Sequence, residues 1–99
     1  MTEALLHLER HGRVLVARLD HPPVNALGAR VRQALADALE QAQADPQIHA
    51  LVITANGPMF SGGADIAEFD KPMVEPLLPA LIDRFEDSDL LTIAAINGP

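Results

Sequence analysis

The stretch from Phe60 to Ile66 has the residue types and spacing that suit oxyanion chemistry. It reads Phe-Ser-Gly-Gly-Ala-Asp-Ile and follows an apolar run that we expect to form a strand. Its two glycines allow positive φ angles and let a ligand approach the main chain closely. The first N–H groups of a helix lack partners within the helix, so an N–H at Ala64 could donate to a carbonyl oxygen that becomes negative during a reaction. A Gly-rich turn that only leads the chain off a sheet explains the same residues, and the spacing alone leaves both interpretations open.

Other kinds of site fit the sequence less well. The stretch is neither Gly-x-Gly-x-x-Gly nor a phosphate loop ending in Gly-Lys-Ser/Thr, which argues against a nucleotide site. The four histidines lack metal-ligand spacing, so no metal site is predicted. The absence of cysteine excludes disulfides and cysteine nucleophiles. For Asp65 we favour capping over direct catalysis, because a carboxylate in a first helical turn accepts from free N–H groups.

Composition limits the classes of partner. The 99 residues are 48% hydrophobic, which predicts one small globular domain over residues 1–99. A net charge of −7, a single lysine and 3% aromatic residues argue against nucleic-acid binding. With no signal peptide and no apolar run near the length of a membrane span, we expect no membrane insertion and a cytoplasmic location. We interpret the acidic excess after residue 65, which includes Glu68, Glu75 and Glu86, as solvated helix faces.

The apolar pattern predicts a mixed α/β fold that would position these residues. A helix is expected over residues 26–43, with Asn25 as its N-cap and with Arg30 and Arg32 largely off its apolar stripe. A second helix is expected over residues 76–87, with a buried stripe formed by Leu78, Leu81, Ile82 and Phe85. Strands are expected at 5–9 and 14–19, which would form a hairpin around Gly12, and at 48–54 and 91–96, which are apolar enough to be buried.

Four motifs occur in order along the chain: His-Pro-Pro-Val-Asn-Ala-Leu at 21–27, Leu-Val-Ile-Thr at 51–54, Phe-Ser-Gly-Gly-Ala-Asp-Ile at 60–66 and Ala-Ala-Ile-Asn-Gly-Pro at 94–99. Together they resemble the enoyl-CoA hydratase/isomerase (crotonase) family. The sequence is most similar to the N-terminal hydratase part of bifunctional fatty-acid oxidation enzymes, which also carry a 3-hydroxyacyl-CoA dehydrogenase. The resemblance implies an α/β fold, namely the N-terminal part of a crotonase-type ββα spiral, truncated.

The same resemblance implies a function in fatty-acid β-oxidation and a set of site residues. The Ala64 N–H would be one of two donors to the oxygen of an acyl-CoA thioester. Coenzyme A enters as part of the substrate, so no separate cofactor is implied in this segment. The acyl-CoA site would be formed by Ala64, Asp65, Ile66, with Ala67 at its margin, and by the loop that contains Val24 and Ala26.

In the family, Asn-Gly-Pro is followed by a Gly-rich turn that supplies the second N–H and by two glutamates that handle the proton and the water. The sequence ends at Pro99, before those positions, and its own glutamates do not match them. Hydration and double-bond isomerisation both stay open. We expect a homo-oligomer, because a truncated spiral leaves apolar surface and open strand edges. The alternatives are a non-catalytic fragment that oligomerises or binds acyl-CoA weakly, and an unrelated α/β nucleotide-binding domain.

Overall fold

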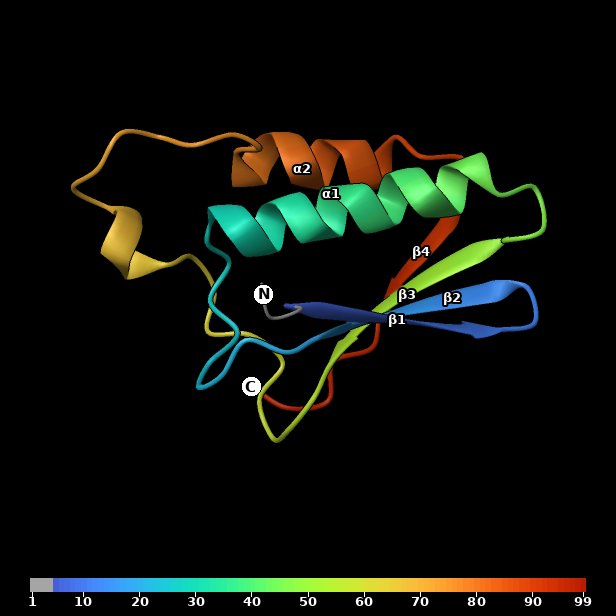
Figure 1. Cartoon of the computed structure of the whole chain (residues 1–99), viewed down its shortest axis with the longest axis horizontal. Helices are drawn as coiled ribbons and strands as arrows, with labels where there is room; N and C mark the ends of the chain where they lie inside the picture. Colours follow the sequence, from blue (N-terminus) through green and yellow to red (C-terminus); the bar gives the residue numbers. More distant parts are fainter. Residues whose placement is uncertain (1–4) are drawn as a thin grey trace, which may run out of the picture.

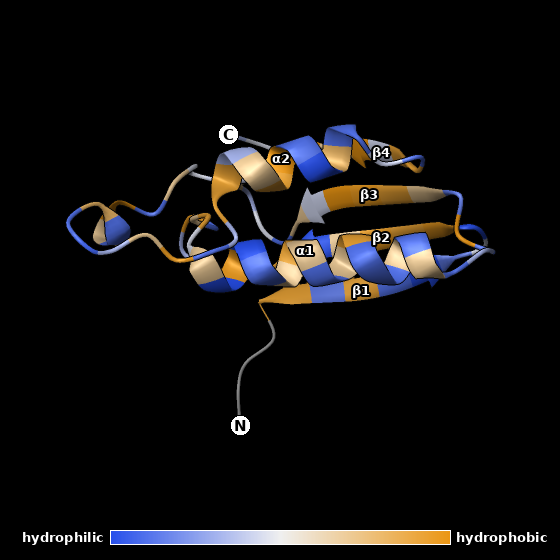
Figure 2. Ribbon diagram, turned by 90° about the horizontal axis from the view of Figure 1, so that it is seen from above, coloured by the Kyte–Doolittle hydropathy of each residue, from blue (hydrophilic) through white to orange (hydrophobic). Residues whose placement is uncertain are grey.

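The computed structural model describes residues 5–99, which form a sheet with two helices packed on one face (Figures 1 and 2). Residues 1–4 of the expected 1–99 domain lie outside this range. No helix in the described part is long and apolar enough to cross a membrane. The elements follow the order β1 (Leu6–His11), β2 (Val14–Leu19), α1 (Ala29–Ala44), β3 (Ala50–Ala55), the 3-10 helix η1 (Ile66–Glu68), α2 (Leu78–Glu86) and β4 (Leu91–Ala94).

The four strands form one sheet in the order β1-β2-β3-β4. β1 and β2 form an antiparallel hairpin, and the turn between them contains Gly12 at a φ of +61°. β2 and β3 are parallel with Val14 opposite Ala50, and β3 and β4 are parallel with Ala50 opposite Leu91. Each parallel pair needs a crossover connection, which α1 and α2 provide. The prediction that these strands share one sheet, with the first long helix on its face, is therefore confirmed.

The core lies between the sheet and the two helices. Alternate residues of β2 point toward α1, and Ala17 of β2, Leu39 of α1 and Leu51 of β3 are completely buried there. Removing one such leucine side chain from water contributes about 1.5–3 kcal/mol. From α2 only Leu81 is fully buried, whereas Ile82 is exposed, so the stripe predicted for this helix is narrower than expected.

Two elements differ from the prediction in position or burial. α1 begins at Ala29 rather than at residue 26, because the backbone is still extended at Gly28, which has a φ of −73° and a ψ of 176°. β4 ends at Ala94 rather than at residue 96, and it is mostly exposed rather than buried. The physical reason is that β4 lies at the edge of the sheet, and both helices pack on the other face from Leu91 and Ile93.

Candidate functional site

Two loops that follow the carboxyl ends of β2 and β3 lie side by side. The Gly62 N–H donates to the Val24 carbonyl at 2.7 Å, and the Leu27 N–H donates to the Gly63 carbonyl at 2.8 Å. These bonds bring the segment with Val24 and Ala26 against the Gly-rich stretch. In parallel α/β sheets this edge, outside the carboxyl ends of the strands, is where ligands commonly bind.

Asn25 joins the two loops and does not cap α1. Its side chain is buried, and its Oδ1 accepts from the His21 N–H at 2.7 Å. Its Nδ2 donates to the carbonyls of Met59 (3.0 Å) and Phe60 (3.1 Å). The expected N-cap role of Asn25 is therefore wrong. Gly28 occupies that position, and it makes no side-chain cap.

The last residues of the chain hold the same loop from the other side. The Asn97 Nδ2 donates to the Gly57 carbonyl at 2.8 Å, and the Phe60 N–H donates to the Pro99 carbonyl at 2.7 Å. Gly98 lies so close to the Pro58 carbonyl that a Cβ at this position would overlap the carbonyl oxygen. The Gly-rich stretch is thus held by both neighbouring segments.

Ala64 follows directly on a backbone reversal. Gly63 has a φ of +90°, a conformation that favours glycine. Ala64 is exposed, and its N–H takes part in no hydrogen bond found within residues 5–99. Asp65 accepts a bond from the Ala67 N–H at 3.0 Å through its Oδ1 and so caps η1, as the capping interpretation predicted.

A cavity of about 450 Å³ opens beside Ala64. Of the six predicted site residues, the described lining includes Ala64 and Asp65, while Ile66 and Ala67 are exposed on η1. Val24 and Ala26 remain next to the Gly-rich stretch and do not reach the cavity lining. The remaining lining is mostly apolar and consists of Phe69, Pro72, Met73, Val74, Leu77, Leu78 and Pro79. Its charged residues are Arg32, Glu68 and Lys71.

Glu68 and Arg32 form an ion pair at the start of α1 that the sequence did not predict. The Glu68 Oε2 accepts from the Ala29 N–H at 2.8 Å, and its Oε1 accepts from Arg32 at 3.0 Å. The Ala29 N–H, and after it the Arg32 guanidinium, hold the pKa of Glu68 below its usual value of 4.5. The expected position of Arg32 off the apolar stripe is therefore wrong, whereas the Glu68 side chain stays 33% exposed while it binds Arg32.

The sequence does contain a signal for the burial of Arg32. It shares the spacing i, i+3, i+4 and i+7 with Leu35, Ala36 and Leu39, all of which are buried on one face of α1. A positive residue on an apolar stripe needs a partner, and Glu68 is a carboxylate close to the candidate site. Glu75 and Glu86 are exposed, as expected.

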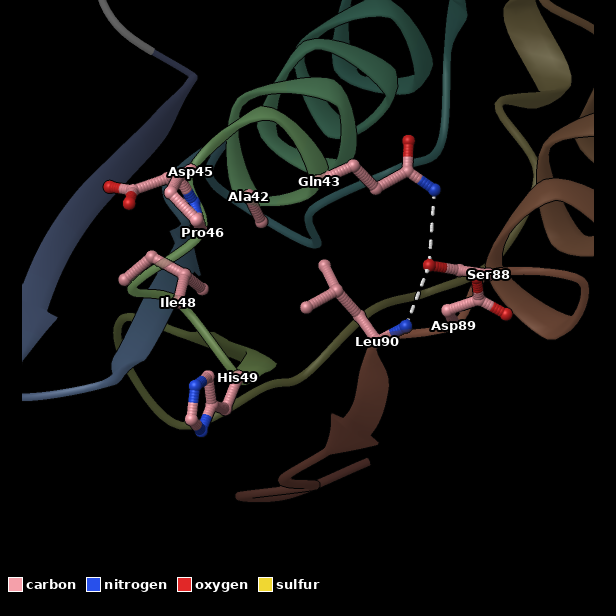
Figure 3. Close-up of a pocket in the computed structure, with 9 residues that line it drawn as sticks. All are labelled: Ala42, Gln43, Asp45, Pro46, Ile48, His49, Ser88, Asp89 and Leu90. Carbon is pink, nitrogen blue, oxygen red and sulfur yellow. Dashed lines mark hydrogen bonds between the residues drawn. The ribbon is translucent and has the colours of Figure 1, made fainter.

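A second cavity, of about 490 Å³, lies at the opposite end of α1 and near the start of β4 (Figure 3). Ser88 lies at its side, where its Oγ accepts from the Gln43 side chain (3.0 Å) and from the Leu90 N–H (3.1 Å). Its lining contains no residue of the Gly-rich stretch or of the loop at 24–27. The cavity beside Ala64 is therefore the candidate site.

Comparison with known proteins identifies the family of the chain. The sequence profile of the family described as "Enoyl-CoA hydratase/isomerase" matches residues 9–99. The chain therefore belongs to the enoyl-CoA hydratase/isomerase family. Family membership excludes the alternative of an unrelated nucleotide-binding domain.

Two relatives and one solved structure show how far the similarity extends. The chain is 42% identical over 85 residues to the peroxisomal bifunctional enzyme of Danio rerio, and the aligned region covers 86% of this chain and 12% of that protein. It is 34% identical over 92 residues to a probable enoyl-CoA hydratase of Bacillus subtilis, and the aligned region covers 86% of this chain and 36% of that protein. A crystal structure of an enoyl-CoA hydratase/isomerase from Pseudoalteromonas atlantica superposes with a TM-score of 0.84 at 32% identity, over 97% of this chain and 39% of the other. The chain thus spans well under half the length of each of these relatives.

Proposed function

We propose that this chain forms the thioester-binding part of an enoyl-CoA hydratase/isomerase of fatty-acid metabolism. The observation that carries the proposal is made at Ala64, an exposed residue that lines a mostly apolar cavity and whose N–H makes no hydrogen bond within residues 5–99. An apolar cavity suits an acyl chain, and a free main-chain donor beside it suits the thioester carbonyl. The names of the relatives support this class of substrate.

In the proposed reaction, the Ala64 N–H donates to the thioester carbonyl oxygen. When a water oxygen bonds to C3 of a 2-enoyl thioester, the electrons of the double bond move toward that carbonyl and an enolate forms. The attacking water loses one proton and C2 takes up one, so that the net change is the addition of H and OH across the double bond. A preorganised N–H is worth most where this negative charge develops, because it stabilises the enolate more than the uncharged substrate.

The carboxylates nearest the Ala64 N–H are already used in holding the fold. Asp65 caps η1, and Glu68 binds both the Ala29 N–H and Arg32. A general base must be free to accept the proton that it removes. The proposal therefore gives Asp65 and Glu68 no acid–base role, and it leaves proton and water transfer to the two glutamates that the family resemblance implies beyond residue 99.

The proposal is tested with the full-length product of the gene that encodes this sequence. A short 2-enoyl-CoA is mixed with the purified protein, and hydration is followed as loss of the conjugated thioester absorbance. A 3-enoyl-CoA in a parallel assay reports isomerisation as a gain of that absorbance, and a saturated acyl-CoA is the control. We expect turnover in at least one assay. A folded protein that turns over neither unsaturated thioester would contradict the proposal.

A further inference from the structure

Arg32 is buried although it carries a charge, and its hydrogen bonds reach several separate parts of the chain. Its Nε donates to the Pro76 carbonyl at 2.6 Å, and its Nη2 donates to the Val74 carbonyl at 2.9 Å. Its Nη1 donates to the Leu27 carbonyl at 2.7 Å and to Glu68 at 3.0 Å. A buried guanidinium is stable only when its donors are paired in this way. Arg32 therefore fixes the positions of the groups that it binds.

The segment between η1 and α2 depends on these bonds. Its apolar side chains are not held by burial, since Phe69 is 70% exposed, Met73 84% and Val74 54%. The segment loops outward beyond the N-terminal end of α1 (Figure 1). Hydrogen bonds from the Arg32 guanidinium to main-chain carbonyls hold this segment in place, as a hydrophobic core would elsewhere.

Glu68 links this anchor to Ala64. It is the last residue of η1, and the cap of η1 is Asp65, which follows Ala64 directly. Because Glu68 binds the Ala29 N–H and Arg32, η1 is fixed to the first turn of α1. Arg32, Glu68 and Ala64 all line the same cavity.

We propose that Arg32 and Glu68 are positioning residues, which hold the Ala64 N–H and the apolar wall of the cavity in the orientation that the reaction needs. The inference rests on the function proposed above. Arg32 acts through the carbonyls of Val74 and Pro76, and Glu68 acts through η1. A shift of about 1 Å in a catalytic group can lower the rate by roughly 10²-fold, so loss of the anchor should lower kcat more than it raises KM.

The test compares variants of the full-length protein by two measurements, enoyl-CoA turnover and amide hydrogen exchange. Arg32→Lys keeps the charge but loses the planar fork that donates in several directions. Arg30→Lys, at the exposed neighbouring arginine, is its matched control. Glu68→Ala removes the acceptor for Ala29 and Arg32, whereas Glu68→Gln keeps an acceptor oxygen and should partly rescue.

For Arg32→Lys and Glu68→Ala we expect kcat to fall about 10- to 100-fold with a smaller change in KM. The bonded amides of Ala67, Glu68, Phe69 and Lys71 should exchange at least about tenfold faster, while those of β2 and β3 keep their protection. Glu68→Gln should lie between Glu68→Ala and the wild type, and Arg30→Lys should match the wild type in both measurements.

Folded variants with wild-type kcat, or with unchanged exchange at these four bonded amides, would overturn the inference. If Arg32→Lys loses protection throughout the sheet, the comparison of Glu68→Ala with Glu68→Gln decides, and equal kcat in those two variants would also overturn it. A wild-type protein without turnover would count against the proposed function instead. The hydrogen-exchange measurement would then still test by itself whether Arg32 and Glu68 hold this segment in place.

Discussion

At the residue scale, close approaches of the main chain explain why particular glycines are needed around the site. A Cβ at Gly98 would overlap the main-chain carbonyl of Pro58. A Cβ at Gly28 would come within 2.9 Å of the Asp65 carboxylate and 3.1 Å of the Glu68 carboxylate. Backbone cannot swing away as the end of a side chain can, so the two positions differ in what a methyl group would displace.

We predict that Gly98→Ala destabilises the protein by about 1–3 kcal/mol, the usual range for overpacking. Gly28→Ala should cost less, because the ends of Asp65 and Glu68 can move aside. Thermal unfolding of both variants measures the difference. An equal loss of stability in the two variants would show that residues 97–99 do not pack on the loop as described.

Several residue-scale features of the site were beyond sequence reasoning because their partners are distant in the chain. Asn25 is a reasonable N-cap by residue type, yet its side chain binds carbonyls more than 30 residues away at Met59 and Phe60. Glu68 and Arg32 are likewise 36 positions apart. The Gly-rich stretch was predictable, since the positive φ at Gly63 and the cap at Asp65 are local properties.

At the scale of elements, the contact between η1 and α1 depends on the negative charge of Glu68. Its contribution to the stability of the fold should therefore decrease in acid. The pKa of Glu68 is lowered in the folded protein, chiefly by the Ala29 N–H and then by Arg32, with Lys71 adding to the same effect. A lowered carboxyl pKa stabilises the fold at pH values above the unfolded pKa, and this contribution is lost as the pH falls through the folded pKa.

We therefore predict that Glu68→Gln is less stable than the wild type above pH 5, and that the difference shrinks below about pH 4.5. Urea unfolding between pH 3.5 and 7 measures it. Glu86→Gln, which removes an exposed carboxylate from α2, is the control for the loss of one negative charge. A difference between Glu68→Gln and the wild type that stays constant over this pH range would contradict the described contact.

The order and type of the elements followed from the sequence, because periodicity distinguishes a helix such as α1 from an apolar strand such as β3. The exposure of β4 did not follow from the sequence. The run from Leu91 to Ile96 is as apolar as β3, but whether such a strand is covered depends on what packs against it. Within residues 5–99 the helices reach only one face of the sheet, so Leu91 and Ile93 remain exposed.

At the scale of the whole molecule, the sheet face opposite the helices is apolar across three strands. The register places Val16, Val52 and Ile93 in one row and Val14, Ala50 and Leu91 in another. Exposed apolar surface next to an open strand edge favours association.

We predict that the 99-residue chain forms oligomers in a concentration-dependent way, and that Ile93→Lys weakens this association. Ile82→Lys, on the exposed side of α2, is the matched control and should leave it unchanged. Sedimentation velocity over a range of concentrations provides the measurement. A stable monomer at all concentrations, with a single cooperative unfolding transition, would contradict the prediction.

The central claim of the account is that the Ala64 N–H stabilises the negative charge on the thioester oxygen. Ala64→Pro removes this donor without a change of charge, and Ala64→Gly keeps it in a looser turn. Turnover of a short 2-enoyl-CoA by the full-length protein, with circular dichroism to confirm that each variant is folded, measures the effect most directly. The account predicts that Ala64→Pro loses about 10²–10³-fold in kcat, as is typical for one oxyanion donor, and that Ala64→Gly loses much less. A folded Ala64→Pro protein with wild-type turnover would contradict the claim.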